Sequence, residues 1–456
     1  MSELLYSIKN AYEVFGEEKI KSAYDYCEGY KIFIDKSKTE RLGIAYSIEL
    51  AKRAGFIQYE DGEKYSAGDK VYFTRKDKAA AFAVIGTESM EKGFNITAAH
   101  MDCPRLDLKP NPLYEDGSLA LFKTHYYGGI KKYQWVARPL MICGVVYKKD
   151  GTKIDICLGD KDDDAVYFIS DILPHLGKNQ GQKKLGEAIS GEELNVIIGS
   201  SFDKDDEKNK IKTKILKILN QKYNITEEDF LTSEIYFVPA THAKDVGLDK
   251  SLLGAYGHDD RVCSYTAFTS LLEAAELKKT AVAVFADKEE VGSMGITGLR
   301  SRFMDYFLEG LCESAGVNPR IAYANSSCLS ADVAAGYDPT FSDVYEKNNS
   351  AYLNCGFAIT KYTGHGGKSN ASEASPDFVA KLCNIFDKAG ALYQFSEMGK
   401  VDAGGGGTVA QFVADKNIEV LDVGVPLLAM HAPYELASKT DIYSLHLGIK
   451  AFYEQM

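Results

Sequence analysis

The stretch from Ala281 to Gly295, AVAVFADKEEVGSMG, limits the possible folds of this chain more than any other. Its first part, 281–286, is a run of small and β-branched apolar residues that is typical of a buried strand. Four charged residues end the run abruptly, and the last two are Glu289 and Glu290. The stretch therefore predicts a strand that delivers two adjacent carboxylates to a loop. If these carboxylates are buried, they need a positive partner such as a metal ion. The alternative is an acidic turn that is exposed to solvent.

Strands and helices alternate on both sides of this stretch. The first 55 residues have a helical pattern, with a capping box at Ser37 and Glu40. We expect strands at 71–74, 81–85, 94–99, 281–286, 320–325 and 418–423, and helices at 262–276, 301–314 and 376–392. This alternation predicts an α/β layered domain with a largely parallel sheet.

The middle of the chain has a different pattern. Short β-rich segments are separated by acidic turns, and the charged runs at 160–164 and 203–210 are interpreted as exposed loops. We therefore expect an inserted, mostly β domain at 109–237. It would interrupt one catalytic domain that is formed by residues 1–108 and 238–456.

The overall charge and the amino terminus exclude several classes of partner. The 456 residues carry a formal net charge of -12, which disfavours binding to nucleic acid or to an anionic membrane. The amino terminus lacks the apolar core of a signal peptide, and no later segment reaches the ~18 apolar residues of a membrane span. With nine scattered cysteines, these features lead us to expect a cytosolic protein.

Histidine and acidic residues follow several of the predicted strands, and one more acid begins a helix. In open α/β sheets ligands bind beyond the carboxyl ends of the strands. The residues at such places are His100, Asp102, Asp259, Glu289, Glu290, Asp332 and His431. Imidazoles with carboxylates suit zinc, manganese or cobalt, and two ions sharing a carboxylate would form a hydrolytic centre. Taken singly, each residue could equally be a structural histidine, a helix cap or a turn former.

Five ordered motifs carry a family resemblance: TAAHMDCPRLDLKP, GHDDRVCSY, DKEEVGS, CLSADVAAGYDP and DVGVPLLAMHAPYE. In order and spacing they resemble the metal-site motifs of the aspartyl aminopeptidases, family eighteen of the metallopeptidases. The resemblance implies two divalent ions, with zinc expected and cobalt or manganese as alternatives. It implies one ion held by His100, Asp259 and Asp332, and another held by Asp259, Glu290 and His431.

The same resemblance implies the roles of two further acids. Glu289 would be the general base that takes a proton from the attacking water and returns it to the leaving amine. Asp102 would hydrogen-bond the far nitrogen of His100, because such a carboxylate fixes the tautomer of a metal-binding imidazole.

The family architecture implies a three-layer α/β/α catalytic domain and an inserted β domain that makes dimer contacts. Dimers in the family assemble further into dodecamers. The segment DILPHL resembles the one that presents a histidine to the active site of a neighbouring subunit, here His175. A plain surface histidine is the alternative.

Several departures leave the preferred substrate open. Asp338 stands where the family commonly has histidine, and Asp259-Asp260-Arg261 resembles family forty-two of the metallopeptidases. Lys361, after a short predicted strand, is the candidate cation for an acidic substrate side chain, and an exposed lysine is the alternative. The glycine run 404–407 is interpreted as a turn that opens a helix.

Three hypotheses follow. The leading one is a cytosolic dinuclear metalloaminopeptidase that removes amino-terminal residues, acidic ones among them, from peptides. The second keeps the metals but assigns another amide hydrolysis, such as deacylation. The third is a non-catalytic scaffold on a peptidase fold.

Overall fold

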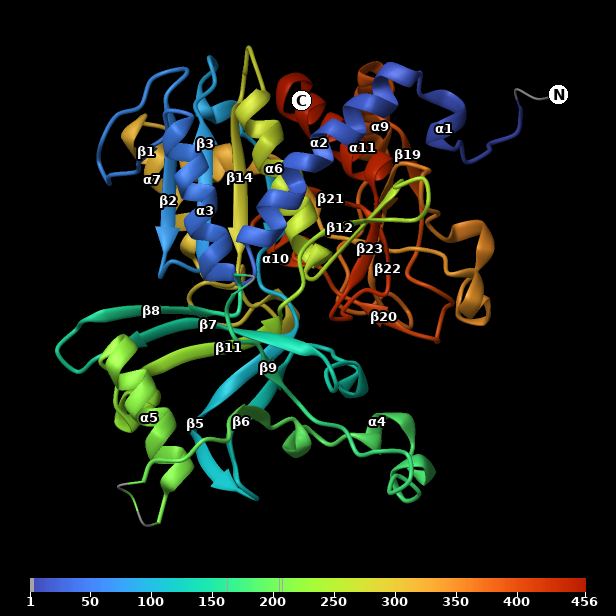
Figure 1. Cartoon of the computed structure of the whole chain (residues 1–456). Coiled ribbons are helices and arrows are strands. Elements are labelled where there is room, and N and C mark those ends of the chain that lie inside the picture. Colours follow the sequence, from blue (N-terminus) through green and yellow to red (C-terminus); the bar gives the residue numbers. More distant parts are fainter. Residues whose placement is uncertain (1–3, 162, 205, 207) are drawn as a thin grey trace. The chain divides into compact units, whose positions relative to one another are not determined.

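The computed structural model describes residues 4–161, 163–204, 206 and 208–456 (Figure 1). Its contacts form two compact units. The first comprises Met1–Asp102, Ala243–Met430 and Glu435–Met456, and the second comprises Cys103–His242 and His431–Tyr434. The second unit thus begins a little before the predicted insert and ends a little after it, and it also includes the short segment that carries His431. No helix in the described part of the chain is long and apolar enough to cross a membrane.

A nine-stranded sheet forms the centre of the first unit. Its strands, in spatial order, are β1 (Ile57–Gln58), β2 (Lys70–Arg75), β3 (Ala79–Val84), β14 (Thr280–Ala286), β4 (Phe94–His100), β15 (Ser327–Ala331), β21 (Glu419–Gly424), β17 (Phe357–Thr360) and β19 (Tyr393–Phe395). The four middle strands, from β14 to β21, pair in parallel. Their carboxyl ends therefore meet at one edge of the sheet, where the chemistry is expected.

Helices cover both faces of this sheet. Alternate residues of β14 belong to two separate hydrophobic cores, because successive side chains of a strand point to opposite faces. One core includes side chains of α2 (Glu17–Lys36), α3 (Glu40–Arg53), α6 (His258–Glu273), α9 (Pro376–Ala389) and α11 (Lys439–Gln455). The other includes side chains of α7 (Phe303–Ser314), α8 (Pro319–Ala324) and α10 (Ala410–Ala414). The predicted α/β/α layering is confirmed.

The predicted strand at 320–325 is wrong. These residues lie in helix α8, which Pro319 begins and which Asn318 caps by accepting a hydrogen bond from the Arg320 N–H at 3.0 Å. Asn followed by Pro is a helix-start signal that outweighs the β-branched and aromatic content of the segment. The strand that precedes Asp332 is instead β15, which is buried throughout.

Two smaller predictions also need correction. The cap of α3 is Thr39, whose hydroxyl accepts the Leu42 N–H at 3.3 Å, rather than Ser37. In the glycine run, Gly405–Gly406 form β20, which pairs with β18 (Gly364–His365). The run therefore makes a short ribbon, and helix α10 begins only at Ala410.

A second, five-stranded sheet completes the first unit. It consists of β12 (Lys244–Val246), β13 (Leu252–Ala255), β23 (Glu435–Ser438), β22 (Pro426–Leu428) and β16 (Ala334–Ala335). Strand β16 follows Asp332 directly, and β13 precedes Asp259. This sheet therefore controls the path of the chain after Asp332 and before Asp259.

The second unit is built on a seven-stranded sheet whose pairings are antiparallel. Its strands are β11 (Ser233–Pro239), β5 (Arg105–Asp116), β6 (Leu119–Tyr127), β10 (Val196–Gly199), β9 (Tyr167–Phe168), β7 (Pro139–Tyr147) and β8 (Lys153–Leu158). A further pairing of β11 with β7 closes the strands from β11 to β7 into a ring, and β8 pairs with the outer side of β7.

Helix α5 (Lys210–Tyr223) of the second unit was not expected from the β-rich pattern of the insert. It buries Ile211 and Ile215, which lie one turn apart on the same helix face. The charged runs at 160–164 and 203–210, interpreted as exposed loops, fall partly outside the described residues, at positions 162, 205 and 207.

Candidate metal centre

Three neighbouring parallel strands deliver the first group of candidate ligands. His100 ends β4, Asp332 follows β15, and Glu289 lies in the short turn after β14. Because β14 and β4 pair in register, with Ala286 opposite His100, these side chains come to one point. One ligand atom from each of the three residues lies within 4.8 Å of the other two. The sheet edge therefore brings His100 together with two residues that lie 189 and 232 positions further along the chain, Glu289 and Asp332.

Asp259 brings a carboxylate to the same imidazole from the start of α6. The His100 Nε2 atom lies 3.2 Å from Asp259 Oδ1 and 3.9 Å from Asp332 Oδ1. His100 and Asp259 are only 1% and 3% exposed. A carboxylate oxygen of Asp259 also lies within 4.8 Å of one of Glu290. Asp259 thus stands between two groups of candidate ligands, as a bridging residue would.

The backbone after β15 places Asp332 accurately. The Asp332 N–H donates to the Val423 carbonyl at 3.0 Å, which continues the pairing with β21. At Gly424 a Cβ atom would meet the Asp332 carbonyl oxygen at 1.7 Å. Any larger residue at that position would therefore displace the backbone that carries this candidate ligand.

Asp102 has a wider role than the one implied by the resemblance. Its backbone carbonyl lies 2.9 Å from His100 Nδ1 and its carboxylate 3.5 Å, so both groups orient the imidazole. The same carboxylate accepts the backbone N–H of Glu289 at 3.1 Å and that of Glu290 at 3.2 Å. Asp102 therefore connects the histidine to the turn that carries both glutamates.

The charges of this cluster fit a divalent cation. Burial raises the pKa of Asp332 well above its ordinary value; His100 opposes the shift, and Glu289 and Asp259 add to it. Burial likewise raises the pKa of Asp260, the residue next to Asp259, and Asp332 adds to that shift. Carboxylates so crowded in a dry site are unfavourable by themselves, whereas imidazole and carboxylate donors are the ligands of zinc, manganese and cobalt. The residues present therefore fit a metal site.

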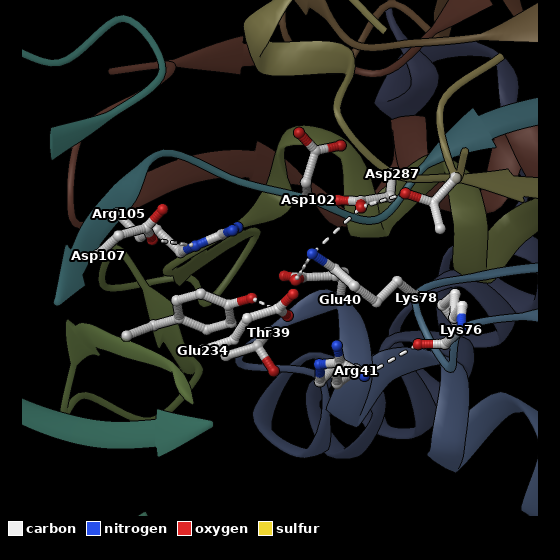
Figure 2. Close-up of polar contacts among 12 residues, drawn as sticks. Thr39, Glu40, Arg41, Lys76, Lys78, Asp102, Arg105, Asp107, Glu234 and Asp287 are labelled. Atoms are coloured by element: carbon white, nitrogen blue, oxygen red, sulfur yellow. Dashed lines mark hydrogen bonds and ion pairs between the residues drawn. The ribbon is translucent and has the colours of Figure 1, made fainter. Parts of the chain in front are cut away.

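A buried ion cluster joins Lys78 and Glu40 to Asp287, which lies just before the acidic turn in the chain (Figure 2). Lys78 Nζ lies 3.1 Å from Glu40 Oε1 and 3.3 Å from Asp287 Oδ2, with all three side chains almost fully buried. Thr297 donates to Asp287 Oδ2 at 2.7 Å. Burial raises the pKa of Asp287 to about 6; Glu40 adds to the shift and Lys78 opposes it. Sequence reasoning missed this cluster, because a lysine in a hairpin between two strands has no local signal of burial.

We expect Lys78→Met to destabilise the fold by about 3–5 kcal/mol, because it leaves two buried carboxylates without their cation. Urea unfolding measures the loss. The control is Lys76→Met, in the same hairpin but exposed, which should change stability by no more than about 0.5 kcal/mol. Equal effects of the two substitutions would show that the ion cluster contributes nothing specific.

His431 belongs to the second unit, and its part in the centre stays a prediction. Its Nδ1 atom lies 3.0 Å from the Gly129 carbonyl oxygen, and since a carbonyl only accepts, Nδ1 carries the hydrogen. The Nε2 atom then keeps its lone pair for a metal. A Cβ on Gly129 would lie 3.2 Å from Nδ1, so glycine permits this close approach.

The two weaker sequence predictions also stay predictions. His175 is exposed in the second unit. Lys361 is exposed immediately after β17, and its neighbours Thr360 and Tyr362 line a pocket of the first unit. Lys361 itself is not among the residues that line this pocket.

Comparison with known proteins identifies the class to which this fold and site belong. Residues 33–453 match the model of the family described as "Aminopeptidase I zinc metalloprotease (M18)". The protein of Clostridium acetobutylicum named "Probable M18 family aminopeptidase 1" is 46% identical over 460 residues, which cover 99% of both chains. Its namesake in Thermotoga maritima is 42% identical and covers 98% of this chain and 99% of its own.

Solved structures of this family have the same fold as the present chain. The crystal structure of the M18-family aminopeptidase from Thermotoga maritima superposes with a TM-score of 0.94 at 40% identity, covering 99% of this chain and 100% of that one. Aminopeptidase I from Clostridium acetobutylicum superposes with a TM-score of 0.93 at 43% identity, with the same coverage. The molecule is thus a metallopeptidase that hydrolyses peptides from the amino terminus. The chain belongs to the M18 family of aminopeptidases.

Proposed function

We propose that this aminopeptidase works with a dinuclear metal centre and an attacking water that bridges the two ions. The observation that carries the proposal is the position of Asp259, whose carboxylate lies 3.2 Å from His100 and close to Glu290. One carboxylate between two ligand groups is the arrangement that lets two ions share a ligand.

The ligand sets follow the sequence prediction. One ion would be held by His100, Asp259 and Asp332, and the other by Asp259, Glu290 and His431. When bound, two such ions would polarise the scissile carbonyl and lower the pKa of a water molecule. Zinc agrees with the family description and with the imidazole and carboxylate donors.

Glu289 moves the proton in this proposal. Its backbone N–H is held by Asp102, so its carboxylate is presented from a fixed turn beside His100 and Asp332. The carboxylate accepts a proton from the attacking water and then donates it to the nitrogen of the leaving peptide. Glu290, whose backbone N–H donates to the other carboxylate oxygen of Asp102, serves as a metal ligand in this scheme.

A substrate screen tests the proposal. The purified protein is assayed with aminoacyl substrates and with their N-acetylated forms, after loading with zinc, cobalt or manganese. We expect cleavage only where the α-amine is free, and only with metal present. Cleavage of the acetylated forms at equal rates would instead support the amidohydrolase reading, and metal binding without any hydrolysis would support a scaffold.

We also propose that the chain forms a cytosolic homo-oligomer. Around His175 the side chains of Ile172, Leu173 and Leu176 are 45%, 50% and 68% exposed, which is unusual for neighbouring apolar residues. A protein of the same fold at 21% identity is titled a dodecamer, the S. cerevisiae mApe1. Light scattering would give the mass of the particle, and a monomer would contradict this proposal.

A further inference from the structure

Two cysteines of the second unit face each other across a hairpin. Strands β7 and β8 are antiparallel neighbours, and their register places Cys143 directly opposite Cys157. The two Sγ atoms lie 3.6 Å apart, and both thiols are free. The two residues are 14 positions apart in the chain, a spacing that matches no cysteine motif. Only the pairing of the two strands therefore brings the thiols together.

The backbone of this hairpin already has the geometry that a disulfide requires. Directly opposite residues of an antiparallel pair have Cα atoms about 4.5–5.5 Å apart. Disulfides join cysteines whose Cα atoms are about 4.4–6.8 Å apart, so the two strands need not move. The sulfurs have to come closer than 3.6 Å, and rotation of the two side chains brings them together.

One of the two thiols is open to solvent and the other is not. Among the nine cysteines, all of which lie in the described part of the chain, Cys157 alone is exposed, whereas Cys143 is fully buried. An oxidant in solution therefore meets Cys157 first, with Cys143 held beside it as the second thiol. Reversibly oxidised cysteines are typically exposed and have such a resolving cysteine next to them.

We infer that Cys143 and Cys157 are the site of a reversible disulfide, and that a low-molecular-weight disulfide is the oxidant. The Cys157 thiolate attacks one sulfur of the small disulfide, which releases one small thiol and leaves a mixed disulfide on Cys157. The Cys143 thiolate then attacks the Cys157 sulfur and displaces the second small thiol. The small disulfide gains the two electrons that the cysteines lose, and the two released thiols take up the two protons.

The bond would fasten an edge strand to its sheet. Strand β8 stands last in the strand order, and β7 is its one partner among the described strands. The outer edge of such a strand can pair with another chain, and the strand itself can separate from its neighbour. A covalent link between β7 and β8 prevents this separation. Because both cysteines lie in the second unit, the inference is independent of the metal centre proposed above.

The test uses the reduced, full-length protein in mixtures of oxidised and reduced glutathione. Samples are quenched with acid, alkylated and digested with trypsin. Cleavage after Lys148, Lys149 and Lys153 separates the two cysteines, so a linked pair of peptides reports the disulfide directly. We expect this pair to form at a rate independent of protein concentration, and dithiothreitol to reverse it. The link should also slow amide hydrogen exchange of β8 by at least about tenfold.

Two variants separate the two steps of the reaction. Cys143→Ala should stop at the mixed disulfide, with glutathione on Cys157. Cys157→Ser, at an exposed position, should leave Cys143 unmodified. Cys383→Ser changes a partly exposed cysteine of the first unit and is the control, which should form the link like the wild type. Circular dichroism checks the fold of each variant, and if Cys143→Ala does not fold, the wild type and Cys157→Ser still decide the question.

Other outcomes overturn the inference. A wild-type protein in which Cys157 carries glutathione but never links to Cys143 contradicts it. A disulfide between the Cys157 residues of two chains contradicts it as well, and so does a wild-type Cys157 that stays reduced in oxidised glutathione. Unchanged hydrogen exchange of β8 in the linked protein would show that the bond does not fasten the strand.

Discussion

Glu289→Gln should lower kcat by about 10²- to 10⁴-fold while the protein keeps its fold and its bound metal. The substitution removes only the ability to accept a proton, because glutamine has nearly the same shape. The turn itself is held by Asp102 through backbone N–H groups, and these are unchanged in the variant. The loss should therefore appear in kcat and not in metal content.

Steady-state kinetics combined with metal analysis of the dialysed protein measures both effects. Glu63→Gln, an exposed glutamate of the same unit, is the matched control and should behave like the wild type. Full activity of a metal-replete Glu289→Gln protein would remove Glu289 from the role of base. If the variant lost its bound metal together with its activity, Glu289 would be a metal ligand and not the base.

His431→Ala should remove about one metal ion per chain and lower kcat/KM by at least about 100-fold. Histidine supplies the neutral nitrogen that the second ligand set otherwise lacks, since Asp259 and Glu290 are both carboxylates. The Gly129 carbonyl fixes the Nδ1 hydrogen of the wild-type ring, so Nε2 is the nitrogen that the substitution removes from the second ligand set.

The measurement is metal content after exhaustive dialysis, followed by titration of activity with added zinc. His125→Ala, an exposed histidine of the second unit, is the control and should retain the full metal content. A His431→Ala protein that binds as much metal as the wild type would show that this residue is structural. Recovery of activity at high zinc concentration would instead agree with weakened binding.

Most of the main sheet could be predicted from short apolar runs. Strands β2, β3, β4, β14 and β21 lie within a residue or two of their predicted bounds, because each contains a short run of buried residues. The exception is the segment 320–325, which has the side-chain pattern of a strand but lies in helix α8. Asn318 caps this helix and Pro319 begins it. Helix α5 was not predicted, because it directly follows the charged run 203–210 and only one of its faces is apolar.

The candidate ligands could also be predicted, since a strand end is a local feature and the chemistry of histidine and carboxylates is fixed. What could not be predicted is how the site is supported. Asp102 holds Glu289 across 187 positions of the chain, and Lys78 reaches Glu40 and Asp287 from an unremarkable hairpin. Contacts between residues so far apart in the sequence produce no pattern that can be recognised from residue spacing.

Most of the strands, the residues at their carboxyl ends and the family resemblance could therefore be predicted from local features of the sequence. Which acids stand around His100, which turn Asp102 supports and which cysteine faces Cys143 depend on the folded structure. The physical reason is that secondary structure and ligand chemistry depend on neighbouring residues, whereas burial and electrostatic environment depend on residues that only folding brings together. The stretch 281–295 shows both cases. Its strand can be predicted from neighbouring residues, whereas the roles of Glu289 and Glu290 depend on residues that are distant in the sequence.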